Sequence, residues 1–233
     1  MIPAAHQQRT ALALTAAEVL LGVTVLLTGE LTPGYDHRYD TVSRLASPGQ
    51  PYAMVVRSAI VAVGVLVTLT ARALRESAAN YRRLVSRLVG VAGAAAVVVG
   101  VAPKDPPDVR PTTVSQLHVT ASLIGVGVLV AAMVYVTWSS PDRAERRRSA
   151  ASVTLIVIAG AAFPLTWGSV VYGLLQRIIL VTALAWLVAT ARRNSPCPGS
   201  GHDKPPCPHP ARVGRRRFER AAAVPSDGGR PVA

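Results

Sequence analysis

The chain has 233 residues, of which half are hydrophobic and only 5% aromatic, and its formal net charge is +13. A hydrophobic share of this size, gathered in long uninterrupted runs, excludes a water-soluble protein and indicates one whose solvent is lipid. The positive charge alone would also suit a nucleic-acid-binding protein. No basic face interleaved with aromatic residues occurs, however, so we expect membrane lipids and no nucleic acid as partners.

Long apolar runs define the predicted fold. A bilayer core about 30 Å thick needs roughly 20 apolar residues for one helical crossing. Unpaired backbone amides are too costly in lipid for open strands, so runs of this length must be helices. The sequence therefore predicts an all-α polytopic membrane protein with a bundle of six transmembrane helices, at residues 11–31, 52–73, 85–102, 116–138, 151–167 and 170–190. We read the first run as a retained helix, because its apolar stretch is longer than that of a signal peptide.

Lys and Arg alternate along the chain in a way that predicts its orientation. Arg9, five residues in 72–87, four in 141–150 and nine after residue 191 would share one side of the membrane. Only four Lys and Arg residues would lie on the opposite side, two in the loop after the first span and two in the loop after the third. Because the side with the positive excess is usually cytoplasmic, we expect both termini in the cytoplasm of a plasma (inner) membrane protein.

The sequence divides into a cytoplasmic N-terminus at 1–10, a six-helix domain at 11–190 and a basic tail at 191–233. The tail is rich in Pro and Gly and has few large apolar side chains, which predicts disorder. It contains both cysteines, Cys197 and Cys207, near His202 and His209. Their spacing, interrupted by Pro, is not typical of a zinc site, so we expect no metal there.

Unusual polar residues concentrate in the two longer outer loops, 32–51 and 103–115. Thr41-Val42-Ser43-Arg44-Leu45 matches Thr113-Val114-Ser115-Gln116-Leu117 at four of five positions. The match suggests a repeated helical hairpin. The alternative is shared helix-start chemistry, because Ser and Thr cap helices wherever they begin.

Charged and amide side chains also enter the spans. Arg57 lies five residues into the second span, and Gln176 and Arg177 lie six to seven residues into the sixth. A charge at this depth is costly unless it is partnered or reaches the headgroups. We expect Arg57 to reach the headgroups, and Arg177 to pair with Asp40 or Asp105 where the outer ends of the second, fourth and sixth spans converge.

Glu18 stands near the middle of the first span, too deep to reach the headgroups comfortably. An ionisable group within a membrane is a candidate functional site by default. An interhelical polar contact that serves structure alone is the competing interpretation.

His118 opens the fourth span, and His37 is the other histidine on the outer side. With nearby Asp they could ligate a metal. An interfacial His that hydrogen-bonds a loop carbonyl is the alternative we favour, because the loops offer many acceptors. We therefore predict neither a metal nor a cofactor.

These residues resemble a family, the small multi-span membrane proteins grouped as domain of unknown function 998. The resemblance includes an acidic first loop that runs to Ser43, Pro103-Lys104-Asp105 after the third span, His118, and Gly173 with Arg177 in the sixth. It covers roughly residues 10 to 190. An aromatic residue often precedes that Pro in the family, whereas Ala102 stands here. The resemblance implies a six-helix membrane fold and no agreed activity.

Two classes of function follow from these patterns. The first is a partner-binding or small-solute-handling membrane component with a polar site at the outer helix ends, where Ser43, Gln176 and Arg177 would bind the ligand. The protein partner, if there is one, is unknown. The second is a small membrane enzyme that acts on a lipid or isoprenoid by acid-base chemistry, with Asp40, Asp105 and His118 as catalytic candidates.

Overall fold

The computed structural model describes residues 4–75, 80–106, 109–165 and 171–193, and its regular elements there are all helices. Six long helices are α1 (Ala4–Glu30), α3 (Ala53–Arg75), α4 (Asn80–Val101), α5 (Thr113–Ser139), α6 (Arg143–Leu165) and α7 (Tyr172–Arg193). The seventh, α2 (Val42–Leu45), has four residues. The predicted all-α fold class is confirmed, and the predicted tail from residue 194 onward lies outside the described residues.

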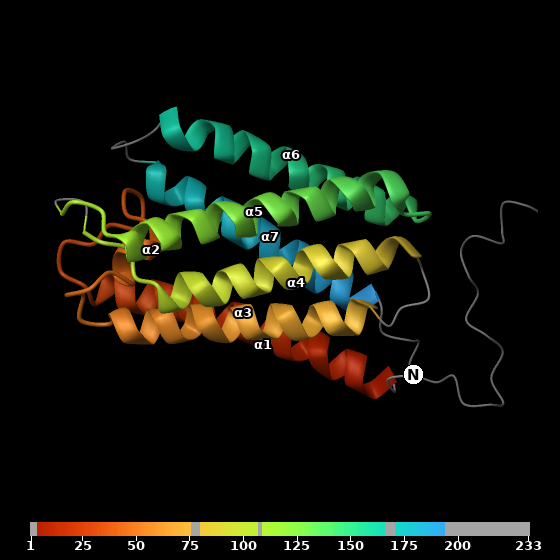
Figure 1. Ribbon diagram of the computed structural model, residues 1–233, viewed down its shortest axis with the longest axis horizontal. Coiled ribbons are helices and arrows are strands. Elements are labelled where there is room, and N and C mark those ends of the chain that lie inside the picture. Colours follow the sequence, from red (N-terminus) through yellow and green to blue (C-terminus); the bar gives the residue numbers. More distant parts are fainter. Residues whose placement is uncertain (1–3, 76–79, 107–108, 166–170, 194–233) are drawn as a thin grey trace, which may run out of the picture. The chain divides into compact units, whose positions relative to one another are not determined.

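The six long helices form one bundle in which they run side by side (Figure 1). α1 packs on α3 and α7, α4 joins α3 to α5, and α6 joins α5 to α7, so the helices close into a ring. Residues 31–52, which we call the first loop, and residues 102–112, the second loop, lie at one end, named here the loop end. The start of α1 and the end of α7 lie together at the opposite, terminal end (Figure 1).

Five of the predicted spans are confirmed as helices long and apolar enough to cross a membrane: Leu12–Glu30, Ala53–Arg75, Tyr81–Val101, Thr113–Ser139 and Tyr172–Arg192. Within its described residues α6 does not qualify, since its first turns carry four Arg and Glu145. The predicted run 151–167 continues past the end of α6 into residues that the structure leaves undescribed. The sixth span therefore stays a prediction, although α6 runs along the bundle beside α5 and α7 (Figure 1).

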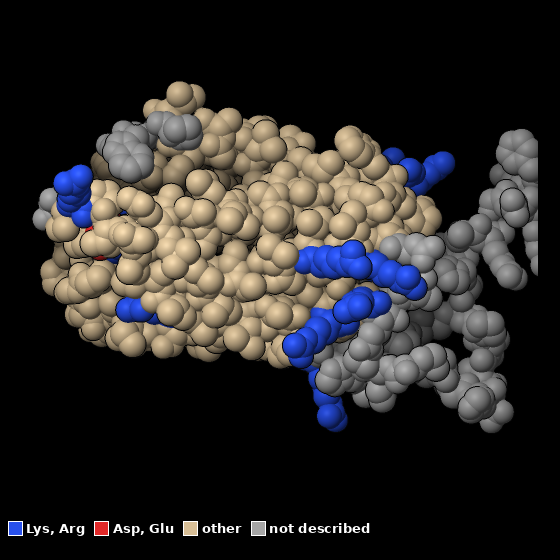
Figure 2. Space-filling model, in the orientation of Figure 1, with Lys and Arg blue, Asp and Glu red and all other residues tan. Residues whose placement is uncertain are grey.

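Lys and Arg side chains lie toward the ends of the bundle on the face that Figure 2 shows, and a broad band between them carries none. Exposed aliphatic side chains also occur away from the helix ends, such as Leu123 and Ile124 on α5. An apolar belt between charged ends is what a lipid-embedded bundle requires.

Small residues bring α3 and α4 into close contact. A Cβ on Gly93 would lie 2.7 Å from the backbone N of Thr68 and 2.8 Å from the carbonyl O of Gly64. A Cβ on Gly64 would lie 2.7 Å from the backbone N of Val97. Close backbone approach at small residues is a main source of helix association in lipid, where burial of apolar surface between helices has little driving force.

The single helical turn α2 packs the first loop against the long helices. Leu45 and Ala46 are almost fully buried and pack with Val25 of α1 and Val56 of α3. This turn contains the first copy of the repeated motif, whereas the second copy begins the long helix α5. Both copies begin helices, as their Ser and Thr content indicated, and the repeated hairpin itself stays a prediction.

Candidate functional site

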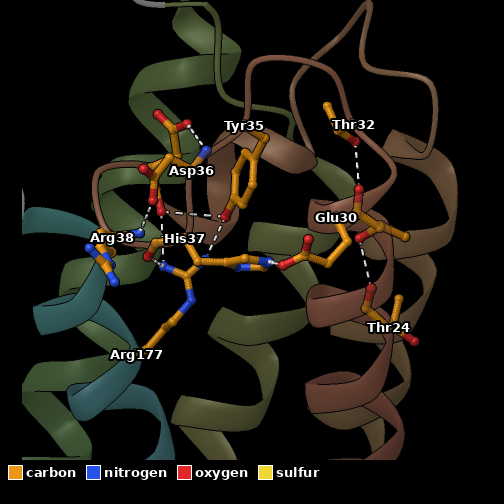
Figure 3. A network of polar contacts seen from close by, with 10 residues as sticks. Thr24, Glu30, Thr32, Tyr35, Asp36, His37, Arg38 and Arg177 are labelled. Carbon is orange, nitrogen blue, oxygen red and sulfur yellow. Dashed lines mark hydrogen bonds and ion pairs between the residues drawn. The ribbon is translucent and has the colours of Figure 1, made fainter.

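Arg177 donates five hydrogen bonds, and four of them join α7 to the first loop. Its Nη1 donates to the carbonyl oxygens of His37 (2.6 Å), Asp40 (2.9 Å) and Gly173 (2.9 Å). Its Nη2 donates to the Tyr35 hydroxyl at 2.6 Å. Figure 3 shows the guanidinium inserted beneath the loop, with these acceptors gathered around it. A cation within the span is thus partnered by protein, as its depth predicted.

The prediction that Arg177 pairs with Asp40 or Asp105 is wrong. Among the described residues, Arg177 forms no ion pair with either carboxylate. The Asp40 carboxylate instead pairs with Arg44 and accepts from the backbone N of Asp36 at 2.9 Å. The physical reason is the shape of the loop, whose carbonyl groups converge on one point. A planar guanidinium with several fixed donors fits such a cluster and leaves the carboxylate free for other contacts.

Tyr35 and His37 complete the cluster around Arg177. The Tyr35 hydroxyl accepts from Arg177 and donates toward the carbonyls of Asp40 (3.3 Å) and Thr41 (3.2 Å). Burial raises the pKa of Tyr35, which keeps this donor protonated. Because Arg177 can only donate to His37 Nδ1 (3.1 Å), the His37 proton resides on Nε2, which lies 3.5 Å from Glu30 Oε1.

Gln176 and Gly173 hold the loop next to Arg177. Gln176 Oε1 accepts from the backbone N of Val42 at 2.7 Å, and the backbone N of Gly173 donates to the Arg38 carbonyl at 2.8 Å. A Cβ on Gly173 would lie 2.9 Å from both the backbone N and the carbonyl C of Asp40. Only glycine permits this approach, so Gly173, Gln176 and Arg177 together fix the conformation of the first loop.

His118 connects α5 with the end of α4 and with the first loop. It is 2% exposed, and its Nδ1 lies 2.7 Å from the Ala102 carbonyl and 3.1 Å from the Val99 carbonyl. Its Nε2 lies 3.2 Å from the Ser43 hydroxyl on α2. The structure therefore supports the expectation that this histidine hydrogen-bonds a loop carbonyl, and it adds a contact to Ser43 that the sequence did not indicate.

Asp105 organises the second loop. Its carboxylate Oδ2 accepts from the backbone N of Thr112 at 2.6 Å, and its backbone N donates to the Ser115 hydroxyl at 3.2 Å. Thr112 in turn caps α5, because its hydroxyl accepts from the backbone N of Ser115. Asp105 thus closes the loop onto the first turn of α5.

A cavity of about 720 Å³ opens between the two loops, the start of α5 and Tyr172 of α7. Asp40, Arg44, Lys104 and Asp105 bring two charges of each sign to its wall. Hydroxyl and amide groups of Thr41, Ser47, Ser115, Gln116 and Thr120 share the wall with the apolar side chains of Pro106, Val109, Pro111 and Val119. Among the predicted site residues, Asp40 and Asp105 line this cavity. Gln176 and Arg177 do not line it, and instead hydrogen-bond the backbone of the first loop.

A family model described as protein of unknown function DUF998 matches residues 15–193. The chain belongs to the DUF998 family. The matched region includes every loop-end residue described above, and it confirms the family that the sequence motifs suggested. Comparison with curated proteins and with solved structures finds no match.

Within the described part of this DUF998 chain, no group of three or more His, Cys, Asp or Glu is placed to hold a metal ion. Both histidines at the loop end have their Nδ1 engaged by other groups, His37 by Arg177 and His118 by carbonyls. The Cys and His residues of the tail lie outside the described residues.

Glu18 does not join the loop-end site. It lies on α1 twelve residues before Glu30, which corresponds to about 18 Å of helix. Its Oε1 is buried without a hydrogen-bond partner among the described residues, and Arg192 of α7 is close enough to act on it electrostatically. Its role stays a prediction.

Two polar side chains of this DUF998 chain, Lys104 and Glu145, have surroundings that could not be predicted from the sequence. Lys104 was noted only as part of a motif, although it borders the cavity. At the terminal end Glu145 is 6% exposed, and its Oε2 accepts from the hydroxyls of Tyr81 and Ser140. Glu145 stands among four Arg in the sequence, a composition typical of a solvated turn, so no sequence signal indicated that it is buried.

Proposed function

We propose that this chain is a multi-pass membrane protein whose loop-end cavity binds a small polar solute or a lipid headgroup that carries an anionic group. The proposal rests on the environment of Lys104. Its side chain borders the cavity, and burial alone lowers its pKa. The described residues provide it with no hydrogen bond or ion pair. A half-buried ammonium without a partner is costly, and an anion in the cavity would remove that cost.

The rest of the cavity wall suits the same ligand. Its volume falls within the range of roughly 300 to 1,000 Å³ that is usual for small-molecule sites. Arg44 adds a second cation, although Asp40 pairs with it, and Ser47 and Ser115 supply hydroxyls. The apolar wall at Val109 and Val119 favours a ligand that also carries a hydrophobic group. A first loop fixed in advance by Arg177 and Gln176 lowers the entropic cost of binding.

Replacing Lys104 with Gln tests the proposal. We expect phosphatidylglycerol or inorganic phosphate to raise the thermal unfolding midpoint of the wild-type protein in a non-ionic detergent, and phosphatidylcholine to leave it unchanged. At about 100 times the dissociation constant the gain corresponds to about 2.7 kcal/mol. Lys104→Gln is expected to lose this gain. Without any additive it should be as stable as the wild type or more so, because a half-buried charge with no partner among the described residues is gone.

Arg110→Gln is the matched control, since Arg110 is an exposed residue of the same loop and does not border the cavity. It should keep the full response. A response to phosphate alone would identify a soluble anion as the ligand, and a response to phosphatidylglycerol alone would identify a headgroup. Equal stabilisation of Lys104→Gln and wild type, or no response to either anion, would contradict the proposal.

For the topology we propose six crossings with the loop end outside and both termini in the cytoplasm of a plasma membrane protein. The support is the position of the basic residues together with α1 beginning and α7 ending at the same end of the bundle (Figure 1). An odd number of crossings would separate these two points. The orientation follows from the positive excess at the terminal end.

Cysteine labelling of intact cells tests the topology. In a background with Cys197 and Cys207 replaced by Ser, a cysteine at Arg110 should react with a membrane-impermeant maleimide. A cysteine at the exposed Pro141, between α5 and α6, should react only after the cells are permeabilised. The reverse pattern would invert the orientation, and labelling of both positions in intact cells would refute the number of crossings.

A further inference from the structure

Ser43 and His118 form a pair whose geometry is that of a nucleophile and its base. They come from segments 75 residues apart, and the Ser43 Oγ lies 3.2 Å from the His118 Nε2. We infer that Ser43 is a reactive serine, with His118 as its general base, and that it forms a covalent acyl-enzyme with carboxylic esters. This inference goes beyond ligand binding in the adjoining cavity, because it concerns a bond-making step.

The carbonyl groups at the end of α4 determine which nitrogen of His118 acts as the base. Both acceptors near Nδ1, the carbonyls of Val99 and Ala102, can only accept, so Nδ1 must carry the ring proton. The lone pair of Nε2 then points at Ser43, whose hydroxyl donates to it. A base held in this tautomer by a third group is the arrangement that activates serine nucleophiles in general.

The last turn of α4 also explains why the acceptors of His118 are available. Carbonyl groups at the end of a helix have no partner within it and carry its partial negative charge. Arg57 occupies two of them, donating from Nε to Gly100 at 2.9 Å and from Nη2 to Val101. The carbonyls of Val99, in the last turn of α4, and of Ala102, directly after it, remain for His118. Their partial negative charge would stabilise the imidazolium that forms when His118 takes a proton.

Substrate access comes from the cavity. Ser43 does not itself line the cavity, but Thr41 and Arg44, which stand close to it in the first loop, do. His118 does not line it either, but Ser115 and Val119, its neighbours on α5, do, so the pair lies next to the cavity. Ser43 is half-buried, whereas His118 is covered, so the nucleophile is the member of the pair that an ester can reach.

The proposed step balances without a metal or an oxidant. The Ser43 oxygen forms a bond to the ester carbonyl carbon while its proton moves to His118 Nε2. Collapse of the tetrahedral intermediate breaks the carbon–oxygen bond to the alcohol, which leaves with that proton. Water, deprotonated by the same nitrogen, then hydrolyses the acyl-serine and restores both side chains.

An alkyl fluorophosphonate probe tests the inference on the full-length protein in detergent or nanodiscs. Ser43 attacks phosphorus, fluoride leaves, and mass spectrometry locates the adduct. We expect labelling of wild-type Ser43, none in Ser43→Ala, and a rate lower by about 100-fold or more in His118→Gln. Ser58→Ala, which changes an exposed serine of α3 that does not line the cavity, should label like the wild type.

A second variant keeps the test informative if His118→Gln folds poorly. In Ser43→Cys, iodoacetamide should alkylate the thiol faster than in Ser58→Cys, although Ser58 is the more exposed position. A folded wild-type protein that does not react with the probe, or that reacts at Ser47 or Ser115 in place of Ser43, would overturn the inference. The probe carries no free anion, so this result is independent of whether Lys104 binds one.

Discussion

Arg177→Leu is expected to release the first loop from α7 and to lower the free energy of unfolding by about 3 kcal/mol. The change removes five donated hydrogen bonds and leaves the carbonyls of His37 and Asp40 and the Tyr35 hydroxyl without the guanidinium as donor. Titration with a denaturing detergent in mixed micelles measures the stability. Limited trypsin digestion reports on the loop itself, because Arg38 is exposed and should be cut faster in the variant.

Arg57→Leu is the matched comparison, because Arg57 also lies a few residues inside a span. Its guanidinium caps the carbonyls of Gly100 and Val101 at the end of α4, a contact worth about 1 kcal/mol or less. We expect normal trypsin sensitivity at Arg38 in this variant. Equal losses of stability for the two variants, or an unchanged digestion pattern in Arg177→Leu, would show that Arg177 does not hold the loop.

Gly93→Ala is expected to force α3 and α4 apart and to destabilise the bundle by about 1 to 3 kcal/mol. The added Cβ would meet the backbone of α3 at Thr68 and Gly64, and backbone atoms cannot turn aside as a flexible side chain would. The same titration in mixed micelles measures the loss.

Gly127→Ala on α5 provides the control for Gly93, because nothing lies within 4 Å of the position of its Cβ. This variant should be unchanged or slightly more stable, since Ala favours helix over Gly. A loss in Gly127→Ala comparable to that in Gly93→Ala would attribute the effect to the loss of glycine in general and would refute tight α3–α4 packing.

The bundle could be predicted from sequence because lipid imposes a simple rule on hydrophobic length. Five helices agree with the apolar runs to within a few residues at most ends, although α1 starts at Ala4, before the run that begins at residue 11. The four residues of α2 could not be found in this way, because one helical turn shows no periodicity. Its place in the bundle depends on the burial of Leu45 and Ala46, which is a tertiary effect.

The residues of the site could be predicted more readily than their contacts. The depth of Arg177 showed that it needs a partner, and that requirement is met. The identity of the partner depended on the path of the first loop, in which Gly34 takes a positive φ of 73° and Gly173 admits the backbone of Asp40. Sequence reasoning favours a carboxylate for a cation, whereas the folded loop supplies carbonyls.

The contact between Ser43 and His118 shows the same limit. Both residues were candidates on the sequence, in different roles, because a separation of 75 residues gives no information on distance. The cavity beside them depends on the packing of both loops against α5. The position of Lys104 at the cavity could therefore not be predicted, since nothing in Pro103-Lys104-Asp105 indicates that the ammonium has no partner among the described residues.

An experimental structure of the chain in lipid nanodiscs, determined with phosphatidylglycerol and inorganic phosphate present, tests the central claim most directly. The claim is that the loop-end cavity holds an anionic group beside Lys104. We predict density for a phosphate group within hydrogen-bond distance of Lys104, between the two loops and the first turns of α5. A cavity without such density, or Lys104 paired with a carboxylate of the protein, would contradict it.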